Sequence, residues 1–520
     1  MACRLAELVS PTAVRIERDP STTHCSSLHI NAETAYPFTV GMSAISRALA
    51  SPHTVRISTL ELRNMPLDAH SLHALARVLH CRQRIRTLIL HHNAMRPADA
   101  SALAQLLDVV RSIRSLRIVS NSLGDDGGRA LEAALRMRRR VAVPLQTLEL
   151  TDVGLGSLGM RRLLAAAIGG ANRSSDGGAT CLNLTLATRD PGTTQATTAP
   201  IVRALRHALV DVDAMAAGRA VAPRAHAARR HGNGGLLLGL GSNRIGDRGT
   251  VRLSALLLRA FGRELTSGPT SNVVLRGLDL RDNHIGDEGA AALAAAVSRL
   301  PNLARLDAGT NPVGAAGFVA LLAMAPSHPS LVSLRLPPGL GRATETPKSQ
   351  PSSWPAALEG RAVAALTALG GSALQELHVP RWDVLGPRAV ATVVDALRRG
   401  SRLTALDLHE SSLPLHVAHS LADVLAQPSC RLRSLRLTSN ALPVRTVVRL
   451  ASALANNTHL RTLDLSNNNV GAMGARALLA SATASGALIE VTYVNAGVGG
   501  KWHHALQQAL RRNKQRWRLS

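Results

Sequence analysis

The sequence predicts an α/β protein built from stacked repeats, each with a short strand, a tight turn and a helix. Three segments, which begin at Ile113, Leu275 and Leu460, share the frame L-x-x-L-x-L-x-x-N-x-[IVL]-G-x-x-G, with Ile113 and Ile118 at two of the leucine places in the first of them. An Ala- and Leu-rich stretch with helical periodicity follows each frame. The chain has 520 residues, of which 46% are hydrophobic, so it exceeds one compact domain and can bury a continuous core.

The same frame recurs across most of the chain. Six intervals between successive starts are 28 residues and two are 29. One such unit cannot bury its own apolar face, so the units are expected to stack on one another. The first apolar residues of the fourteen units are Ile57, Ile85, Ile113, Leu145, Cys181, Gly235, Leu275, Leu303, Leu331, Leu374, Leu403, Leu432, Leu460 and Leu488, where Gly235 holds an apolar place.

Each part of the frame has a physical role. The alternating leucines point into the core from a short strand, and the glycines allow a tight turn. An asparagine stands where the strand ends, and we expect its amide to bond backbone groups left unpaired at the bend. These asparagines are Asn93, Asn121, Asn243, Asn283, Asn311, Asn440 and Asn468. Asp247 and Asp287 place a carboxylate at the beginning of a helix, where the helix dipole favours it.

Other units depart from the frame at the asparagine position, and we expect looser or rearranged turns there. The residues at this position are Met65, Val153, Arg189, Gly339, Trp382, Ser411 and Ala496.

This frame and its spacing resemble the leucine-rich-repeat superfamily, in its ribonuclease-inhibitor type, over roughly residues 57–510. The resemblance implies a horseshoe-shaped α/β solenoid with a parallel sheet on the concave side and helices on the convex side. Residues 1–56 are expected to form an N-terminal cap with a degenerate repeat that includes Leu28 and Ile30. Residues 511–520 are expected to form a basic C-terminal tail.

Insertions interrupt the period at residues 136–144, 169–178, 187–234, 262–272 and 341–355. The first four follow a helix and precede a strand, so they are expected on one rim of the solenoid, and the fifth on the opposite rim. Two of them are rich in arginine, which predicts a basic rim, although insertions also vary freely in length. Its candidate residues are Arg136, Arg138, Arg139, Arg140, Arg219, Arg224, Arg229 and Arg230.

The formal net charge of +26 should attract acidic partners. Lysine accounts for only three of the 60 cationic residues, so the arginine content also fits the coding bias of a GC-rich genome. Aromatic residues make up 2% of the chain, too few for a surface that stacks many bases, and this argues against nucleic acid as the partner.

The outward positions of the strands give a candidate partner-binding face. It carries both signs of charge and is locally acidic at Asp279 and Asp307, whereas a surface that follows phosphates should be continuously basic. Alternating charges suit recognition of a protein by complementarity, and the alternative is simple solubility of an exposed sheet. The candidate residues are Asp279, Arg281, Arg305, Asp307, Arg335, Asp407, His409, Arg436, Arg461 and Asp464.

No motif predicts catalysis, a cofactor or a metal. The segment AGVGGKW has Asn495 and Trp502 where a phosphate-binding loop needs Gly and Ser or Thr. The histidine pairs spaced three residues apart lack further ligands at metal-binding spacing. The five scattered cysteines, the absence of a signal-like N-terminus and the lack of a long apolar stretch predict an intracellular, cytoplasmic protein with no membrane span, with the cytoskeleton or flagellum as further locations.

The sequence therefore predicts a non-enzymatic scaffold that binds protein partners, with an acidic partner surface at the arginine-rich rim. Two alternatives stay open. One is a GTPase regulator resembling the Ran GTPase-activating proteins, with a small GTPase as its partner. The other is a cytoskeletal or flagellar component that docks on acidic tubulin surfaces.

Overall fold

The structure is a computed structural model of the chain. It describes residues 14–18, 25–31, 57–80, 85–141, 143–170, 182–187, 201–208, 235–262, 274–338, 354–379, 382–385 and 387–519. The chain divides into two compact units, Met1–Ile245 with Ala255–Asp279, and Gly246–Ser254 with Leu280–Ser520.

In the described residues of the first unit, nine strands pair in chain order. Strands β1 and β2 are antiparallel, and from β2 onward each strand is parallel to the next. The strands are β1 (Val14–Arg18), β2 (Cys25–Asn31), β3 (Thr59–Arg63), β4 (Thr87–His91), β5 (Ser115–Val119), β6 (Thr147–Thr151), β7 (Leu182–Ala187), β8 (Leu236–Gly239) and β9 (Leu275–Asp279).

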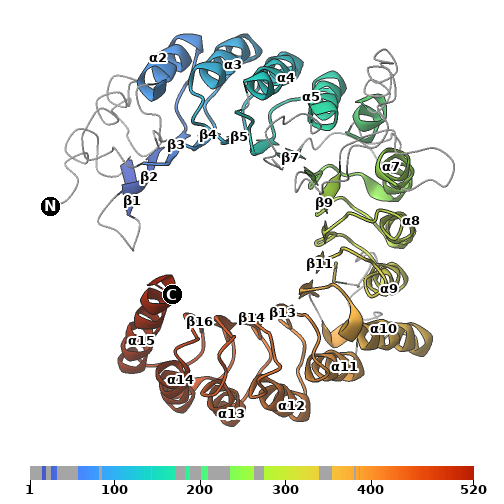
Figure 1. The fold of residues 1–520 in the computed structure, drawn as a ribbon, viewed down its shortest axis with the longest axis vertical. Coiled ribbons are helices and arrows are strands. Elements are labelled where there is room, and N and C mark those ends of the chain that lie inside the picture. The colour runs from blue at the N-terminus through green and yellow to red at the C-terminus, as the bar shows by residue number, and fades with distance from the viewer. Residues whose placement is uncertain are drawn as a thin grey trace, which may run out of the picture. The chain divides into compact units, whose positions relative to one another are not determined.

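Helices alternate with these strands and cover one face of the sheet (Figure 1). They are α2 (Ala69–His80), the short η4 (Pro97–Asp99), α3 (Ala100–Val109), α4 (Gly124–Arg140) and α5 (Ser157–Gly170), and residues 201–208 are also helical. Helix α7 (Gly246–Phe261) crosses the boundary between the two units.

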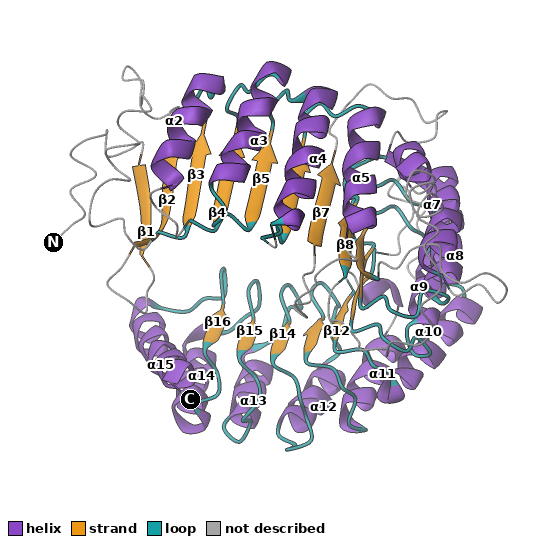
Figure 2. Cartoon of the chain, turned by 45° about the horizontal axis from the view of Figure 1, so that its top comes forward, coloured by secondary structure: helices purple, strands orange, loops and turns teal. Residues whose placement is uncertain are grey.

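The described residues of the second unit repeat the same arrangement with seven parallel strands, again with helices on one face (Figure 2). Its strands are β10 (Arg305–Asp307), β11 (Ser333–Arg335), β12 (Glu376–His378), β13 (Ala405–Asp407), β14 (Ser434–Arg436), β15 (Thr462–Asp464) and β16 (Glu490–Thr492). Its helices are α8 (Asp287–Val297), α9 (Ala315–Met324), α10 (Ala356–Ala368), η5 (Leu369–Gly371), η6 (Trp382–Leu385), α11 (Pro387–Arg398), α12 (Leu415–Leu425), α13 (Val444–Leu454), α14 (Gly471–Ser485) and α15 (Gly500–Leu519).

Within each unit the strands lie on the concave side and the helices on the convex side (Figure 1), which confirms the α/β solenoid predicted from the frame. A described strand lies in every one of the fourteen frames, from β3 to β16. The frame leucines meet in register across neighbouring strands; Leu60, Leu88, Leu116 and Leu148, for example, are partners and are fully buried. Burying each such side chain contributes about 1.5–3 kcal/mol.

The asparagine amides bond backbone groups at the bend, as predicted, and they also connect neighbouring repeats. Asn311 accepts hydrogen bonds at Oδ1 from the backbone N–H groups of Asn283 (2.7 Å) and Ile285 (3.2 Å), both in the preceding repeat. Its Nδ2 donates to the carbonyl oxygens of Leu280 and Ala308, 2.9 and 2.8 Å away. Asn440 and Asn468, four and five units further along the chain, repeat this pattern.

The residue before each asparagine takes a left-handed backbone conformation. Ser120, Asp282, Thr310, Ser439 and Asn467 have φ values of 52°, 54°, 54°, 57° and 55°. Short polar residues tolerate this region best, because their side chains bond locally, whereas a β-branched apolar residue would be strained. This explains the polar residue that precedes each of these asparagines.

Two of the atypical turns are well ordered rather than loose. The Ser411 hydroxyl takes the place of an asparagine amide and donates to the carbonyl oxygens of Leu408 (2.6 Å) and His409 (3.2 Å). In the preceding repeat, Trp382 is fully buried at the beginning of η6. At these two positions the turns are therefore rearranged, which is one of the two forms expected, and they are not loose.

The structure also changes the limits of two predicted segments. Helix α15 runs without a break through residue 510, so residues 511–519 are helical and do not form a separate tail. Residues 136–140 of the first insertion form the last turn of α4. Residues 171–178, 188–200, 209–234, 263–272 and 341–353, which make up most of the other insertions, lie outside the described residues, as does 32–56 of the expected cap.

The part of the cap that is described contains a true strand. Leu28 and Ile30 are buried in β2, which pairs in parallel register with β3. In the described part of the chain, no helix combines the length and apolar character needed to cross a bilayer.

Candidate functional site

The outward side chains of the second unit form a continuous row of charge across its sheet. Its members occupy the same register position on successive strands, so that each lies directly opposite the next. We call these residues the strand-face row: Asp307, Arg335, His378, Asp407, Arg436 and Asp464. Opposite charges in directly opposed positions attract each other across a sheet.

The first part of the row is centred on the Asp307 carboxylate. Its Oδ2 lies 3.2 Å from Nη1 of Arg335 and 3.4 Å from Nε of Arg281, which stands beyond the strand ends. Its Oδ1 accepts a hydrogen bond of 3.0 Å from the backbone N–H of Gly309, which fixes the carboxylate in place.

The second part is centred on Asp407, whose side chain is only 8% exposed. Its Oδ2 lies 3.1 Å from Nη1 of Arg436 and 3.7 Å from Nδ1 of His378. Its Oδ1 lies 2.9 Å from Nδ1 of His409 and accepts a hydrogen bond of 3.1 Å from the His409 backbone N–H. Arg436 also approaches Asp464, with Nε 3.7 Å from Oδ2.

Burial and these neighbours act in opposite directions on the acid–base groups. Burial alone would raise the pKa of the Asp407 carboxyl, but the adjacent imidazoles of His378 and His409 outweigh it and hold that pKa well below its usual range. The contact with Asp407 raises the pKa of His409, against the effect of its partial burial. The carboxylate and a protonated His409 therefore stabilise each other.

The arginines of the row project further than the carboxylates. The side chains of Arg335 and Arg436 are 46% and 55% exposed, and that of Arg281, which lies next to the row, is 51% exposed. Those of Asp307 and Asp464 are 21% and 27% exposed, and that of Asp407 even less. A molecule that approaches this face meets guanidinium groups, held in fixed positions by carboxylates recessed beneath them.

The remaining predicted face residues lie in different places. Arg305 is exposed at the beginning of β10, and Asp279 ends β9 in the first unit. Arg461 precedes β15, and its guanidinium donates a hydrogen bond of 2.9 Å to the carbonyl oxygen of Ala487 in the next repeat. It therefore satisfies a backbone acceptor there.

The arginines predicted for the basic rim also separate. Arg136 is exposed on α4 and pairs with Glu132 at 2.8 Å. Arg139 and Arg140 end the same helix, whereas Arg219, Arg224, Arg229 and Arg230 lie outside the described residues.

Arg138 is buried, so its placement on a basic surface is wrong. Its guanidinium donates to the carbonyl oxygens of Leu107 (2.5 Å), Val110 (3.2 Å), Arg111 (3.0 Å), Val143 (3.2 Å) and Ile113. Burial lowers the pKa of Arg138 to about 10, so it stays charged at neutral pH. This side chain holds the end of α3 against α4 and is structural.

Sequence reasoning missed two partners of buried carboxylates. His378 lies on the row beside Asp407, and its signal was available because it holds the outward position of its frame. In the first unit, the buried Glu61 contacts both His29 and Arg63. Burial would raise the pKa of Glu61, but the hydrogen bonds from Arg63 and His29 lower it overall. His29 could be matched to Glu61 only once β2 was known to pair with β3.

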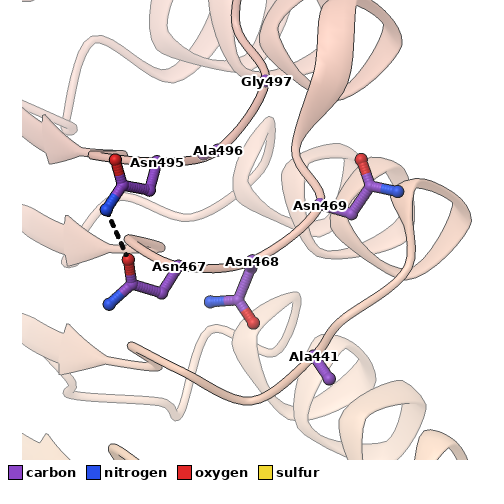
Figure 3. A pocket seen from close by; sticks show the side chains of 7 residues that line it. All are labelled: Ala441, Asn467, Asn468, Asn469, Asn495, Ala496 and Gly497. Atoms are coloured by element: carbon purple, nitrogen blue, oxygen red, sulfur yellow. Dashed lines mark hydrogen bonds between the residues drawn. The ribbon is translucent and has the colours of Figure 1, made fainter.

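A shallow hollow of about 560 Å³ lies beside the row, where the chain turns after β15 and β16 (Figure 3). It is lined by Ala441, Asn467, Asn468, Asn469, Asn495, Ala496 and Gly497. Its side-chain amides bond to each other and to neighbouring turns: Nδ2 of Asn495 donates to Oδ1 of Asn467 (3.1 Å), and Nδ2 of Asn467 donates to Oγ of Ser439 outside the hollow (3.1 Å). The asparagine side chains thus brace successive turns, and among the described residues no cluster of His, Cys, Asp and Glu is suited to a metal ion.

Comparisons with known proteins agree with this architecture. A family model described as "Leucine Rich repeat" matches residues 111–131, 271–294 and 456–479. The chain is 30% identical to a Tonsoku-like protein of Mus musculus over 241 residues, which is 44% of this chain and 16% of the mouse protein. It is 34% identical over 98 residues to a NACHT, LRR and PYD domains-containing protein 1a of Rattus norvegicus, covering 19% of this chain and 8% of the rat protein.

The chain thus spans a small part of the length of these relatives. Among solved structures, actin-binding site 2 of leiomodin-1 aligns with 30% of this chain and 90% of its own, at 18% identity and a TM-score of 0.28.

Proposed function

We propose that this chain, which is a leucine-rich-repeat protein, acts without catalysis as a scaffold that binds a protein partner on the strand-face row of its second unit. The observation that carries the proposal is the arrangement of Arg335 and Arg436 over recessed carboxylates. Binding of protein partners is common among leucine-rich-repeat proteins, and this supports the general proposal of a protein-binding scaffold.

Stability alone does not account for the row. Ion pairs at a solvent-accessible surface contribute about 0–1 kcal/mol each, and the pair of the half-exposed Arg335 with Asp307 lies at such a surface. Arginines already held in place lose little side-chain freedom on binding, and they pair with carboxylates in a defined geometry. The proposed partner therefore presents a surface that is acidic where it meets these arginines.

A matched pair of variants tests the proposal. Arg305→Glu with Arg335→Gln changes the charge of the strand face by three units. Arg398→Glu with Arg449→Gln makes the same change on the helices α11 and α13, where both arginines have carboxylate partners. Circular dichroism and thermal melting first establish that both variants are folded.

Partners captured by the wild-type chain from lysate are then compared with those captured by the two variants. We expect the strand-face variant to lose a partner that the helix-face variant retains, with about a tenfold weaker affinity once that partner is purified. Equal capture by both variants, or a loss in both, contradicts binding on the strand face.

The same variants address the two narrower functions considered from the sequence. Stimulation of GTP hydrolysis by candidate small GTPases, or co-sedimentation with microtubules, would identify the partner if it depended on Arg305 and Arg335 and not on Arg398 and Arg449. A positive result that ignores both pairs would place the binding surface elsewhere on the chain.

A further inference from the structure

Helix α15 has an unusual charge distribution for its length. Its sequence, GKWHHALQQALRRNKQRWRL, contains six cationic residues and no acidic one. Its apolar side is fixed: Leu506, Ala509 and Leu510 are buried, and Nδ2 of the buried Asn513 donates to the carbonyl oxygens of Ala482 (2.7 Å) and Leu488 (2.9 Å). The helix therefore cannot rotate to redistribute its charge.

Its outer side carries a dense cluster of cations. Arg511, Arg512, Lys514 and Arg516 are all exposed, and we call these four residues the α15 cluster. From Arg511 to Arg516 the cluster extends about 7.5 Å along the helix axis. Within the described part of the chain none of the four has an ion-pair partner, whereas α4, α11 and α13 each carry an exposed arginine paired with a carboxylate, in the pairs Arg129–Asp126, Arg398–Asp395 and Arg449–Asp423.

An aromatic side chain adjoins the cluster. Trp517 lies one turn beyond Asn513 on the anchored side of the helix, yet it is 52% exposed. A half-exposed indole beside unpaired guanidinium groups offers one apolar contact together with four charges in a short length. Such surfaces are typical of recognition sites for short protein segments.

We propose that the α15 cluster with Trp517 is a second binding surface, which takes a short acidic peptide segment that carries an apolar side chain. This surface lies on a helix and is independent of the strand-face row. A peptide fits better than a nucleic acid for two reasons. The cluster is too compact to follow a run of phosphates, and a duplex backbone presents no apolar group to the indole.

The test uses the full chain and a short fluorescein-labelled peptide of glutamates with one central leucine. The cluster variant is Arg511→Gln, Arg512→Gln, Lys514→Gln and Arg516→Gln. The control is Arg388→Gln, Arg398→Gln, Arg399→Gln and Arg402→Gln, which removes four exposed arginines from and after α11. Both variants lose the same net charge, so a difference between them reports the position of the charge.

We expect the cluster variant to bind the peptide about tenfold or more weakly at moderate salt, and the control to change by about twofold or less. Trp517→Ala should weaken binding of the leucine peptide but not of an all-glutamate peptide, and peptide binding should shift the fluorescence of Trp517 to shorter wavelength. Circular dichroism and thermal melting of each variant establish that the chain keeps its helix content and its stability.

Three outcomes overturn the inference. Equal losses in the cluster variant and the control would mean that net charge alone attracts the peptide. Indifference of both peptides to Trp517→Ala would remove the apolar contact. A labelled single-stranded or duplex oligonucleotide that binds more tightly than the peptide, with the same dependence on the cluster, would assign the surface to nucleic acid. None of these results bears on the strand-face variants, so the two proposals fail separately.

Discussion

The indole Nε1 of Trp382 donates a hydrogen bond of 2.8 Å to the backbone carbonyl oxygen of Asp407, in the next repeat. Along the neighbouring seams the corresponding carbonyls accept from a backbone N–H instead: the N–H of Leu408 bonds Arg436, and that of Leu437 bonds Asp464. A side chain has therefore replaced a backbone donor where the repeat lacks its asparagine. The same residue, Asp407, supplies the buried carboxylate of the strand-face row.

Replacing Trp382 by phenylalanine should lower the free energy of unfolding by about 1–3 kcal/mol, because the Asp407 carbonyl loses its donor. Urea unfolding followed by circular dichroism measures this loss. Trp502→Phe, on a half-buried indole with no described hydrogen-bond acceptor, is the control and should stay within about 0.5 kcal/mol of the wild type. Equal effects of the two substitutions would show that the Trp382 hydrogen bond is not needed.

The pair of Asp407 and His409 should make stability depend on pH in a defined direction. The pKa of His409 is raised in the folded state, so its contribution is fully present below the unfolded value of 6.5 and is lost as pH rises through the folded pKa. The difference in unfolding free energy between wild type and His409→Gln should therefore shrink as the pH is raised above 6.5.

Asp407 should make stability depend on pH in the opposite direction. The pKa of Asp407 is lowered, so its contribution is present above the unfolded value of 3.8 and is lost as the pH falls well below it. NMR titration supplies an independent check, because Asp407→Asn should bring the pKa of His409 back towards its ordinary value. An unchanged His409 titration in that variant would contradict the pairing.

Arg138→Met should be among the most damaging single changes in the first unit. Five carbonyl oxygens lose their donor at a buried position, and we expect a loss on the order of 3 kcal/mol or more. Arg136→Met, two residues away on the same helix, breaks only its pair with Glu132, which keeps Arg162 as a partner, and should cost less than about 1 kcal/mol. Thermal melting of the two variants side by side measures the contrast.

Asp247→Ala should loosen the beginning of the next helix. Oδ1 of Asp247 accepts hydrogen bonds from the backbone N–H groups of Gly286 (2.7 Å) and Gly289 (2.9 Å) at the start of α8. Losing such a cap costs about 1 kcal/mol. Hydrogen exchange should quicken in the first turn of α8, whereas Glu288→Ala, an exposed first-turn residue, should leave those amides nearly as protected as in the wild type.

Much of the fold could be predicted because the same sequence frame recurs along the chain. The strand, the buried leucines and the bond from Asn311 to the Ala308 carbonyl oxygen in its own turn all follow from local spacing. The role of Asp247 was predicted only in part. The frame places it at the beginning of its own helix, but the carboxylate reaches the helix of the following repeat, and that contact depends on how the units stack.

Positions that act across repeats without a fixed motif could not be predicted. Arg138 belongs to an arginine run that looks like a solvated surface, and only packing shows that its guanidinium points inward. His328 has a similar structural role at the end of α9: its Nε2 donates to the Leu300 carbonyl oxygen (3.1 Å) while its Nδ1 accepts from the backbone of Leu331 (3.0 Å). Burial lowers the pKa of His328, consistent with this neutral form.

The sequence predicted the signs of the charges on the strand face but not how exposed each charged side chain is. Counting residues suggested a locally acidic face, yet side-chain length decides what is exposed. A long arginine rises above a short aspartate on the next strand, as Arg335 does over Asp307. Sequence alone does not state which member of an ion pair covers the other.

The asparagine seams have a consequence for how such a chain changes length. Asn440 and Asn468 make the same set of bonds to the repeat before them, 28 residues apart. Joining two distant units through one such seam would leave every amide with an equivalent acceptor and donor. Duplication or loss of a whole unit would thus keep the hydrogen bonds between the units on either side. Removal of a few residues within a unit would disrupt these hydrogen bonds to both of its neighbours.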